Sequence, residues 1–180
     1  MKKVILLVAL FTTSVTLFAQ KKTTTSATVS FDATTPKDAL PKAENKTVIG
    51  SINTQTGEVA FEAAVNNFSF SNPSMQEHFN GERWMNSTQF PKFTFTGKIA
   101  NINKVKFAKN GTYKVTVNGD LTIKGVTKKT NLSGTIKVTD GKIKIISNFT
   151  IKLADYNITG QPIEAGKVAK EPKISVSAEF

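Results

Sequence analysis

The sequence predicts an all-β domain, an antiparallel barrel of eight strands with one short helix. Two observations support this prediction: apolar and polar side chains alternate with period two along most of the chain, and glycine-containing turns separate the alternating segments. The composition agrees, because 39% hydrophobic and 21% charged residues in a chain of 180 are typical of one globular domain with a core. A closed barrel leaves no exposed strand edge, whereas a two-sheet sandwich is the structural alternative.

The alternation is clearest in the second half of the chain. In Tyr113–Lys124 the odd positions are mainly apolar and the even positions polar, as in a half-buried strand. The phase reverses in Thr130–Val138 and again in Ile143–Leu153, and Ile174–Phe180 ends the chain in the same way. Less regular segments upstream complete the count of eight strands: 28–32, 46–53, 58–70 and 92–103.

Two turns set the register of the strands between residues 113 and 153. We interpret Gly125-Val126 as a type II′ loop, which places Val115 opposite Ile136 and Tyr113 opposite Val138. We interpret Asp140-Gly141 as a type I′ loop, which gives these further cross-strand pairs: Val138 with Ile143, Ile136 with Ile145, and Leu132 with Phe149. Both registers place all apolar faces on one side, so turn chemistry and periodicity agree.

The same registers predict a row of small side chains inside the barrel. Val117, Gly134 and Ser147 fall in one cross-strand row, between bulkier rows on either side. A row with so little volume favours a cavity, because an eight-stranded barrel holds one small ligand when its interior side chains are small. The alternative is a bend at the glycine, with the gap filled from the opposite strands.

One segment departs from the β pattern. Asn72 is a good helix N-cap, Pro73 suits the first turn and Asn80-Gly81 suits the end, so we expect a helix over Pro73–Phe79. Met75 and Phe79 lie one turn apart on it. They either fill the core beneath the helix or form a lid over the mouth of the barrel.

Residues 1–19 have the order of a secretory signal: Lys2 and Lys3, then an apolar run, then small residues before Ala19. We expect cleavage after Ala19 and a periplasmic or secreted protein. The alternative is an uncleaved anchor, but the apolar run is shorter than the roughly 20 residues that span a bilayer. Gln20–Ser26 has no apolar periodicity and is interpreted as a flexible lead-in, so the folded domain comprises residues 27–180.

The composition disfavours most catalytic and metal sites. The chain has no cysteine and His78 is the only histidine, so one chain supplies neither a thiolate nor a multi-histidine metal site. We therefore expect no enzyme activity, cofactor or metal, with an enzyme using His78 as the least favoured alternative. The net charge of +11 comes almost wholly from lysines, since Arg83 is the only arginine. Lysines on the polar faces suit a solvated outer wall or contact with a membrane surface, whereas binding of nucleic acid is disfavoured.

Three blocks of the sequence resemble the YceI-like family. The first comprises Met75–Asn80, Trp84–Ser87 and Phe90–Phe95, the second is Gly119–Lys128, and the third runs from Phe149 to Tyr156. The resemblance implies a lipocalin-like barrel whose interior binds a polyisoprenoid or another long apolar lipid. Lys124 stands where the family commonly has histidine, and this difference concerns the ligand more than the fold.

We therefore expect an exported protein that binds and carries a long apolar lipid without reaction. A filled barrel with no ligand, serving a structural or interaction role, is the alternative, and the oligomeric state stays open. The side chains expected to face the ligand, in the interior and at the mouth, are these: Phe61, Phe68, Phe70, Met75, His78, Phe79, Trp84, Phe93, Phe95, Tyr113, Val115, Val117, Leu121, Leu132, Gly134, Ser147, Phe149 and Ile151.

Overall fold

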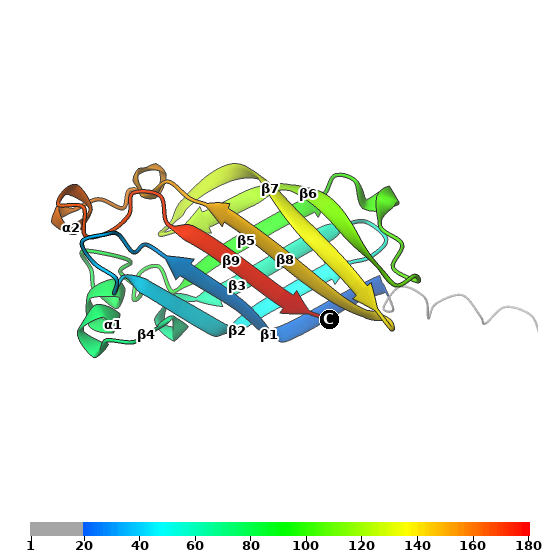
Figure 1. The fold of residues 1–180 in the computed structure, drawn as a ribbon, viewed down its shortest axis with the longest axis horizontal. Coiled ribbons are helices and arrows are strands. Elements are labelled where there is room, and N and C mark those ends of the chain that lie inside the picture. The colour runs from blue at the N-terminus through cyan, green and yellow to red at the C-terminus, as the bar shows by residue number, and fades with distance from the viewer. Residues whose placement is uncertain (1–19) are drawn as a thin grey trace, which may run out of the picture.

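Antiparallel pairing closes the chain into a barrel (Figure 1). The computed structural model describes residues 20–180, so the predicted signal sequence lies outside the described residues. The long strands are β1 Lys21–Asp32, β2 Lys42–Asn53, β3 Glu58–Ala64, β5 Lys92–Ile99, β6 Gly111–Ile123, β7 Val126–Thr139, β8 Lys142–Thr150 and β9 Lys173–Glu179. They pair in the order β1-β9-β8-β7-β6-β5-β3-β2, and a β1–β2 pairing closes the ring. The prediction of an eight-stranded antiparallel barrel is confirmed, and the sandwich alternative is wrong.

Short helices and one extra strand complete the fold. The helical elements are α1 Pro73–Asn80, α2 Gln161–Glu164, and the 3₁₀ turns η2 Val65–Asn67, η3 Ile102–Lys104 and η4 Leu153–Tyr156. Figure 1 shows α1 and α2 at the same end of the barrel. The predicted helix is confirmed and extends one residue further, to Asn80, and the Asn72 side chain accepts a 2.9 Å hydrogen bond from the Ser74 N–H as its N-cap.

The interpretation of Gln20–Ser26 as a flexible lead-in is wrong. β1 begins at Lys21, and Lys21–Thr24 pair with Gly50–Asn53 of β2. Threonine is β-branched and favours strands, while none of residues 21–26 is buried. The segment therefore lacks apolar periodicity because neither of its faces packs into the core.

Other strand limits also differ from the prediction. Segment 58–70 is not one strand, because η2 separates β3 from the two-residue β4 Ser69–Phe70, which pairs with the start of β2. At this break the fully buried Asn45 donates a 2.9 Å hydrogen bond to the Ala64 carbonyl and accepts from the N–H and hydroxyl of Thr47. A buried amide with these partners replaces regular pairing at the bend. Among the remaining limits, β2 starts earlier, at Lys42, and β5 and β8 end earlier, at Ile99 and Thr150.

The predicted β6–β7 register is wrong by two residues. The loop is Lys124-Gly125, not Gly125-Val126, and both residues have positive φ, 48° and 75°, as a type I′ turn requires. As a result Val115 lies opposite Gly134, and Tyr113 lies opposite Ile136. A shift of two residues keeps every side chain on its predicted face, because the side-chain period of a strand is two.

The predicted β7–β8 register is confirmed for most of its length. Asp140 and Gly141 form the loop with positive φ, and Val138 and Ile136 lie opposite Ile143 and Ile145. The expected pair of Leu132 with Phe149 does not form, because this ladder ends at Gly134 and Ser147.

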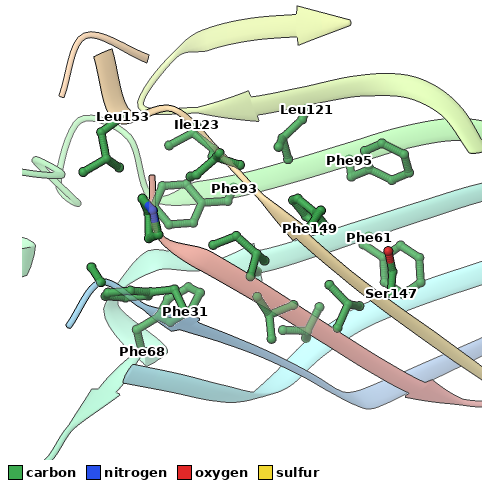
Figure 2. A pocket seen from close by; sticks show the side chains of 18 of the residues that line it. Phe31, Phe61, Phe68, Phe93, Phe95, Leu121, Ile123, Ser147, Phe149 and Leu153 are labelled. Carbon is green, nitrogen blue, oxygen red and sulfur yellow. The ribbon is translucent and has the colours of Figure 1, made fainter. Parts of the chain in front are cut away.

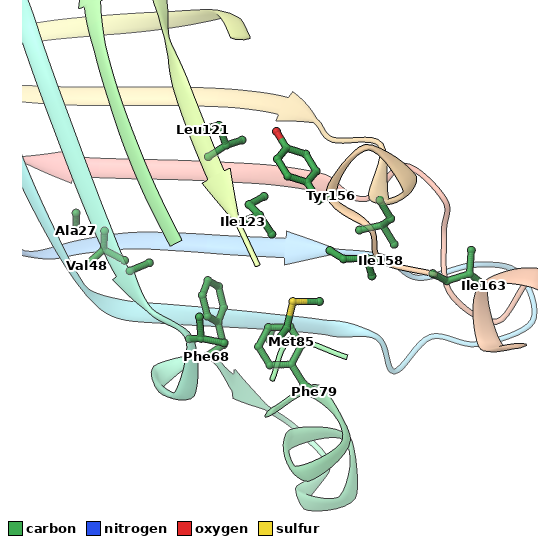
Figure 3. Close-up of a cluster of buried hydrophobic side chains, with 14 of the residues drawn as sticks. Ala27, Val48, Phe68, Phe79, Met85, Leu121, Ile123, Tyr156, Ile158 and Ile163 are labelled. Atoms are coloured by element: carbon green, nitrogen blue, oxygen red, sulfur yellow. The ribbon is translucent and has the colours of Figure 1, made fainter. Parts of the chain in front are cut away.

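Two apolar clusters occupy the interior. One fills the end of the barrel near η3, with Ile52, Ile99 and Ile136 almost completely buried. The other surrounds the opposite end, where residues of the barrel wall meet α1, η4 and α2 (Figure 3). Phe79 of α1 and Ile163 of α2 belong to this second cluster, so both helices are anchored by apolar contacts.

Candidate functional site: an apolar cavity in the barrel

A cavity of about 370 Å³ lies inside the barrel, toward the end that carries α1 and α2. Nearly all of its lining is apolar, with phenylalanine and branched aliphatic side chains from every long strand (Figure 2). Its volume falls within the roughly 300–1,000 Å³ that is typical of small-molecule sites. The interior is therefore hollow over part of its length, which argues against the alternative of a filled barrel.

The cavity ends at the packed cluster near η3. Ile99, Val115 and Ile136 belong to that cluster and also line the cavity, so they form its floor. Tyr113, on the same strand as Val115, lies beyond this floor, where its hydroxyl donates to the Lys106 and Lys109 carbonyls at 3.3 and 3.2 Å. Tyr113 therefore stabilises the loop between η3 and β6 at the closed end of the barrel and is not among the residues that line the cavity. The prediction of Tyr113 as a ligand-facing residue is wrong.

Glycines keep the cavity open by letting phenylalanine rings lie against the wall. A Cβ at Gly50 would be 2.7 Å from the ring of Phe61, and a Cβ at Gly119 would be 2.7 Å from the ring of Phe95. A Cβ at Gly97, which pairs with Gly119, would also contact the Phe95 ring, at 2.9 Å. The rings thus occupy the places of missing side chains, on the neighbouring strand at Gly50 and Gly119 and on the same strand at Gly97, and the centre of the barrel stays empty.

A row of small side chains adds to this space. In the correct register the row is Val115, Gly134, Ser147 and Val176, all of which line the cavity. The prediction that β6 contributes Val117 to this row is wrong, because the β6–β7 loop lies one residue earlier than expected. Val117 nevertheless lines the cavity in the next row, opposite Leu132.

An aromatic cluster surrounds the cavity below α1. The rings of Phe31, Phe68, Phe70, Phe79 and Phe93 form a connected set with centroid separations of 5.0–6.0 Å. Phe79 contacts three of them, so the helix is held over the barrel by aromatic packing. Phe79 is buried, and both Phe79 and Met75 line the cavity, so α1 fills part of the core and covers the mouth at once.

The few polar side chains of the lining lie mainly at the mouth. Asp38 comes from the β1–β2 loop, His78 from α1 and Lys167 from the segment after α2. Within residues 20–180 there is no group of three or more His, Cys, Asp or Glu side chains that could hold a metal ion. His78 is exposed on α1 and borders the mouth of the cavity.

The resolved pKa shifts belong to groups outside the cavity lining. Burial, with Asp155 beside it, raises the pKa of the Tyr156 hydroxyl. Hydrogen bonds from the Thr34 hydroxyl and N–H, at 2.6 and 2.9 Å, lower the pKa of Asp32, aided by nearby lysines. A hydrogen bond and the positive charge of Lys144 lower the pKa of Glu179.

The structure brings nearly all of the predicted site residues together. Those that line the cavity are Phe61, Phe68, Phe70, Met75, His78, Phe79, Trp84, Phe93, Phe95, Val115, Val117, Leu121, Leu132, Gly134, Ser147, Phe149 and Ile151. The lining residues that sequence reasoning missed include Val29 and Phe31 on β1, Ile174 and Val176 on β9, and Leu153, Ile158 and Val168 around η4 and α2. The alternation on β1 and β9 was a usable signal for the first two groups, whereas the irregular backbone around η4 and α2 offered none.

A hollow, closed antiparallel barrel with an apolar interior defines a class of small-molecule-binding barrels. The family model of the YceI-like domain matches residues 9–180, and the chain belongs to this family. Among solved structures, it is similar to BcnA of Burkholderia cenocepacia, with 19% identity, coverage of 86% of this chain and 96% of that one, and a TM-score of 0.72. No match was found among curated proteins.

Two further structures share the fold. A polyisoprenoid binding domain from Saccharophagus degradans, implicated in plant cell wall breakdown, has 13% identity, covers 89% of this chain and 97% of its own, and gives a TM-score of 0.75. A YCEI protein of Campylobacter jejuni has 19% identity, with coverage of 100% of this chain and 99% of that one, and gives a TM-score of 0.54. At these identities the likeness concerns the fold, which is the lipocalin-like barrel that the sequence predicted.

Proposed function

We propose that this protein binds a long apolar lipid of the polyisoprenoid class inside the barrel and carries it without chemical reaction. The observation that supports the proposal most directly is the almost wholly apolar cavity of about 370 Å³, closed at one end by the packed cluster near η3 and covered at the other by α1. An apolar chain gains about 0.8 kcal/mol for each methylene that it buries. The polar side chains of the lining lie mainly at the mouth, so most of the wall favours an apolar ligand over a polar one.

The shape of the site favours a chain over a compact ligand. The lining runs from the floor at Ile136 to the mouth at Met75 and Pro162, so it follows the axis of the barrel. The Saccharophagus degradans neighbour is described as a polyisoprenoid binding domain, which agrees with a ligand of this class. Phe61 and Phe95 offer their ring faces along the wall, where a chain of isoprene units can lie in contact with them.

The proposal is tested with a series of isoprenoid alcohols on protein expressed from its full-length gene. A neutral fluorescent probe, N-phenyl-1-naphthylamine, is bound first, and geraniol, farnesol and geranylgeraniol then compete for the cavity. We expect displacement to strengthen with chain length, because each added isoprene unit buries more apolar surface. Extraction of the purified protein into organic solvent, followed by mass spectrometry, identifies a lipid that is retained from the cell.

A filled barrel predicts a different result. In that case neither the probe nor any alcohol binds, and no lipid is extracted. Displacement that is independent of chain length would also contradict the proposal, because it would place the alcohols at a surface site.

We further propose that the protein is exported to the periplasm or secreted. The support is the order of charged, apolar and small residues ahead of Ala19. Among residues 20–180, no helix has both the length and the apolar character needed to cross a membrane. The surplus of lysine on the polar faces favours contact with an anionic membrane surface, by roughly 1 kcal/mol for each lysine close to it.

A further inference from the structure

The wall of the barrel is split between β7 and β8. Their ladder runs from the pair Thr139–Lys142 to the pair Gly134–Ser147 and ends there. β7 nevertheless continues back to Val126, paired only with β6, and β8 continues to Thr150, paired only with β9. We call this gap the β7–β8 slit, with residues 126–133 on one side and 148–150 on the other. Figure 1 shows the β6–β7 hairpin diverging from β8 in this region.

The slit lies beside the cavity. Leu132 on one of its sides and Phe149 on the other both line the cavity, and both are only half-buried. Figure 2 shows Phe149 on β8 among the lining side chains. The turn η4, which follows β8, packs against β7 on the side of the mouth. A second strand segment without a partner, residues 21–26 of β1 on its β9 side, does not line the cavity.

One lysine has an unusual place at this slit. Lys128 pairs with Leu121 across the β6–β7 ladder, so its side chain leaves the sheet on the same face as a residue that lines the cavity. Directly opposite side chains have their Cβ atoms about 4.5–5.5 Å apart, so the stem of Lys128 starts within one strand spacing of the cavity wall. Lys129 faces the other way, toward the outer surface, opposite Asp120.

The Lys128 ammonium group is available for a ligand. The side chain is exposed, and within residues 20–180 it takes part in none of the ion pairs. A cation on the cavity face, next to a gap in the wall, is in position to meet a charged group whose apolar chain occupies the cavity. An apolar cavity with a cation beside a gap in its wall fits an amphiphile of opposite charge, and Lys167 at the mouth is a second cation at the cavity edge.

We propose that the β7–β8 slit receives the polar end of the bound lipid and that Lys128 selects an anionic head group, a carboxylate or a phosphate. This inference rests on the proposed binding of an apolar chain in the cavity. It adds that the ligand is an anionic amphiphile and that its head lies at the side of the barrel, apart from Asp38, His78 and Lys167 at the mouth.

The test compares head groups on one chain length. Dodecanoate, dodecyl phosphate and dodecanol each displace N-phenyl-1-naphthylamine from the wild-type protein, Lys128→Gln and Lys129→Gln. The two variants lose the same charge from adjacent residues, so Lys129→Gln controls for the overall field of the protein. Inorganic phosphate, added alone, shows whether a free ion is sufficient to displace the probe.

We expect both anionic amphiphiles to bind the wild type about 5-fold more tightly than dodecanol, the ratio expected for one partly solvated ion pair. Lys128→Gln should remove this preference, while Lys129→Gln keeps it and affinity for the probe is unchanged in both variants. Inorganic phosphate should leave the probe in place.

Two results would overturn the inference and are distinguishable from failure of the proposed function. If the probe and dodecanol bind but Lys128→Gln keeps the preference for anions, the head group lies elsewhere and only the slit assignment is wrong. If both variants lose the preference equally, the general positive charge of the protein explains it. If the probe and dodecanol do not bind the wild type at all, the proposed function itself is wrong.

Discussion

Replacing Gly134 by phenylalanine tests whether the cavity is real space that a ligand uses. Gly134 lies in the row of small side chains, and its Cβ position is 3.1 Å from the Ile146 carbonyl oxygen and 3.7 Å from Val115 and Ser147. The first contact requires a shift of a few tenths of an ångström, and the other two are ordinary. Beyond the Cβ, the new ring enters the cavity of about 370 Å³.

The expected change in stability is a difference of two terms. Burial of a phenylalanine side chain contributes about 1.5–3 kcal/mol, and the tight Cβ contact with the necessary adjustment costs about 1–3 kcal/mol. The free energy of unfolding of Gly134→Phe should therefore stay within about 1–2 kcal/mol of the wild type. Affinity for N-phenyl-1-naphthylamine should fall at least about 10-fold, because a lost contact area worth 1.4 kcal/mol already gives that factor.

Gly134→Ala is the matched control, since it adds the Cβ without the ring. Its unfolding free energy measures the contact with Ile146 alone, and its affinity for the probe should remain close to that of the wild type. Urea unfolding and probe titration are carried out on all three proteins. A loss of more than about 3 kcal/mol in Gly134→Phe relative to Gly134→Ala, with unchanged binding of the probe, would show that the site is packed and refute the reasoning.

Further predictions concern the wall, the surface and the N-terminus. Gly50→Ala should push the flexible ring of Phe61 into the cavity and weaken probe binding with little loss of stability. Gly119→Ala places its Cβ in a clash with the rigid Thr96 carbonyl oxygen, so its free energy of unfolding in a urea titration should fall by at least about 2 kcal/mol. Equal losses of stability in both variants would contradict this expectation. In β7, alternate amides between residues 127 and 131 point into the slit, whereas the corresponding amides of residues 135–139 are paired with β8. In hydrogen exchange the amides that point into the slit should therefore exchange much faster than those paired with β8. Uniform protection along β7 would show that the slit is closed. The pKa of Asp32 is lowered in the folded protein, so its carboxylate stabilises the fold at pH values above its ordinary pKa of 3.8. Asp32→Asn should therefore lower the free energy of unfolding there, by less than about 1 kcal/mol because the group is so exposed, and the difference from the wild type should vanish as the pH falls through the lower pKa of the folded state. A difference that persists at pH 2 would have another cause. Intact mass of the exported protein should place its N-terminus at Gln20, and retention of residues 1–19 would be evidence against a cleaved signal.

The sequence by itself determined the class of fold and the inward face of the strands. Alternation in Tyr113–Lys124 and Ile143–Leu153 fixes which side chains share a face, because successive residues of a strand point to opposite sides of the sheet. For this reason the β6–β7 register error of two residues left the predicted lining almost intact. Asn72 and Pro73 likewise located α1, since a helix start depends on local hydrogen bonds and backbone angles.

Only the tertiary structure decided which strands end early and where the space lies. The break after Ala64 depends on the side chain of Asn45, which comes from another strand. The open interior depends on the ring of Phe95 lying over Gly97 and Gly119. The β7–β8 slit exists because β8 turns into η4 while β7 stays paired with β6. These features arise from contacts between residues far apart in the chain, and such contacts leave no periodic signal in the sequence.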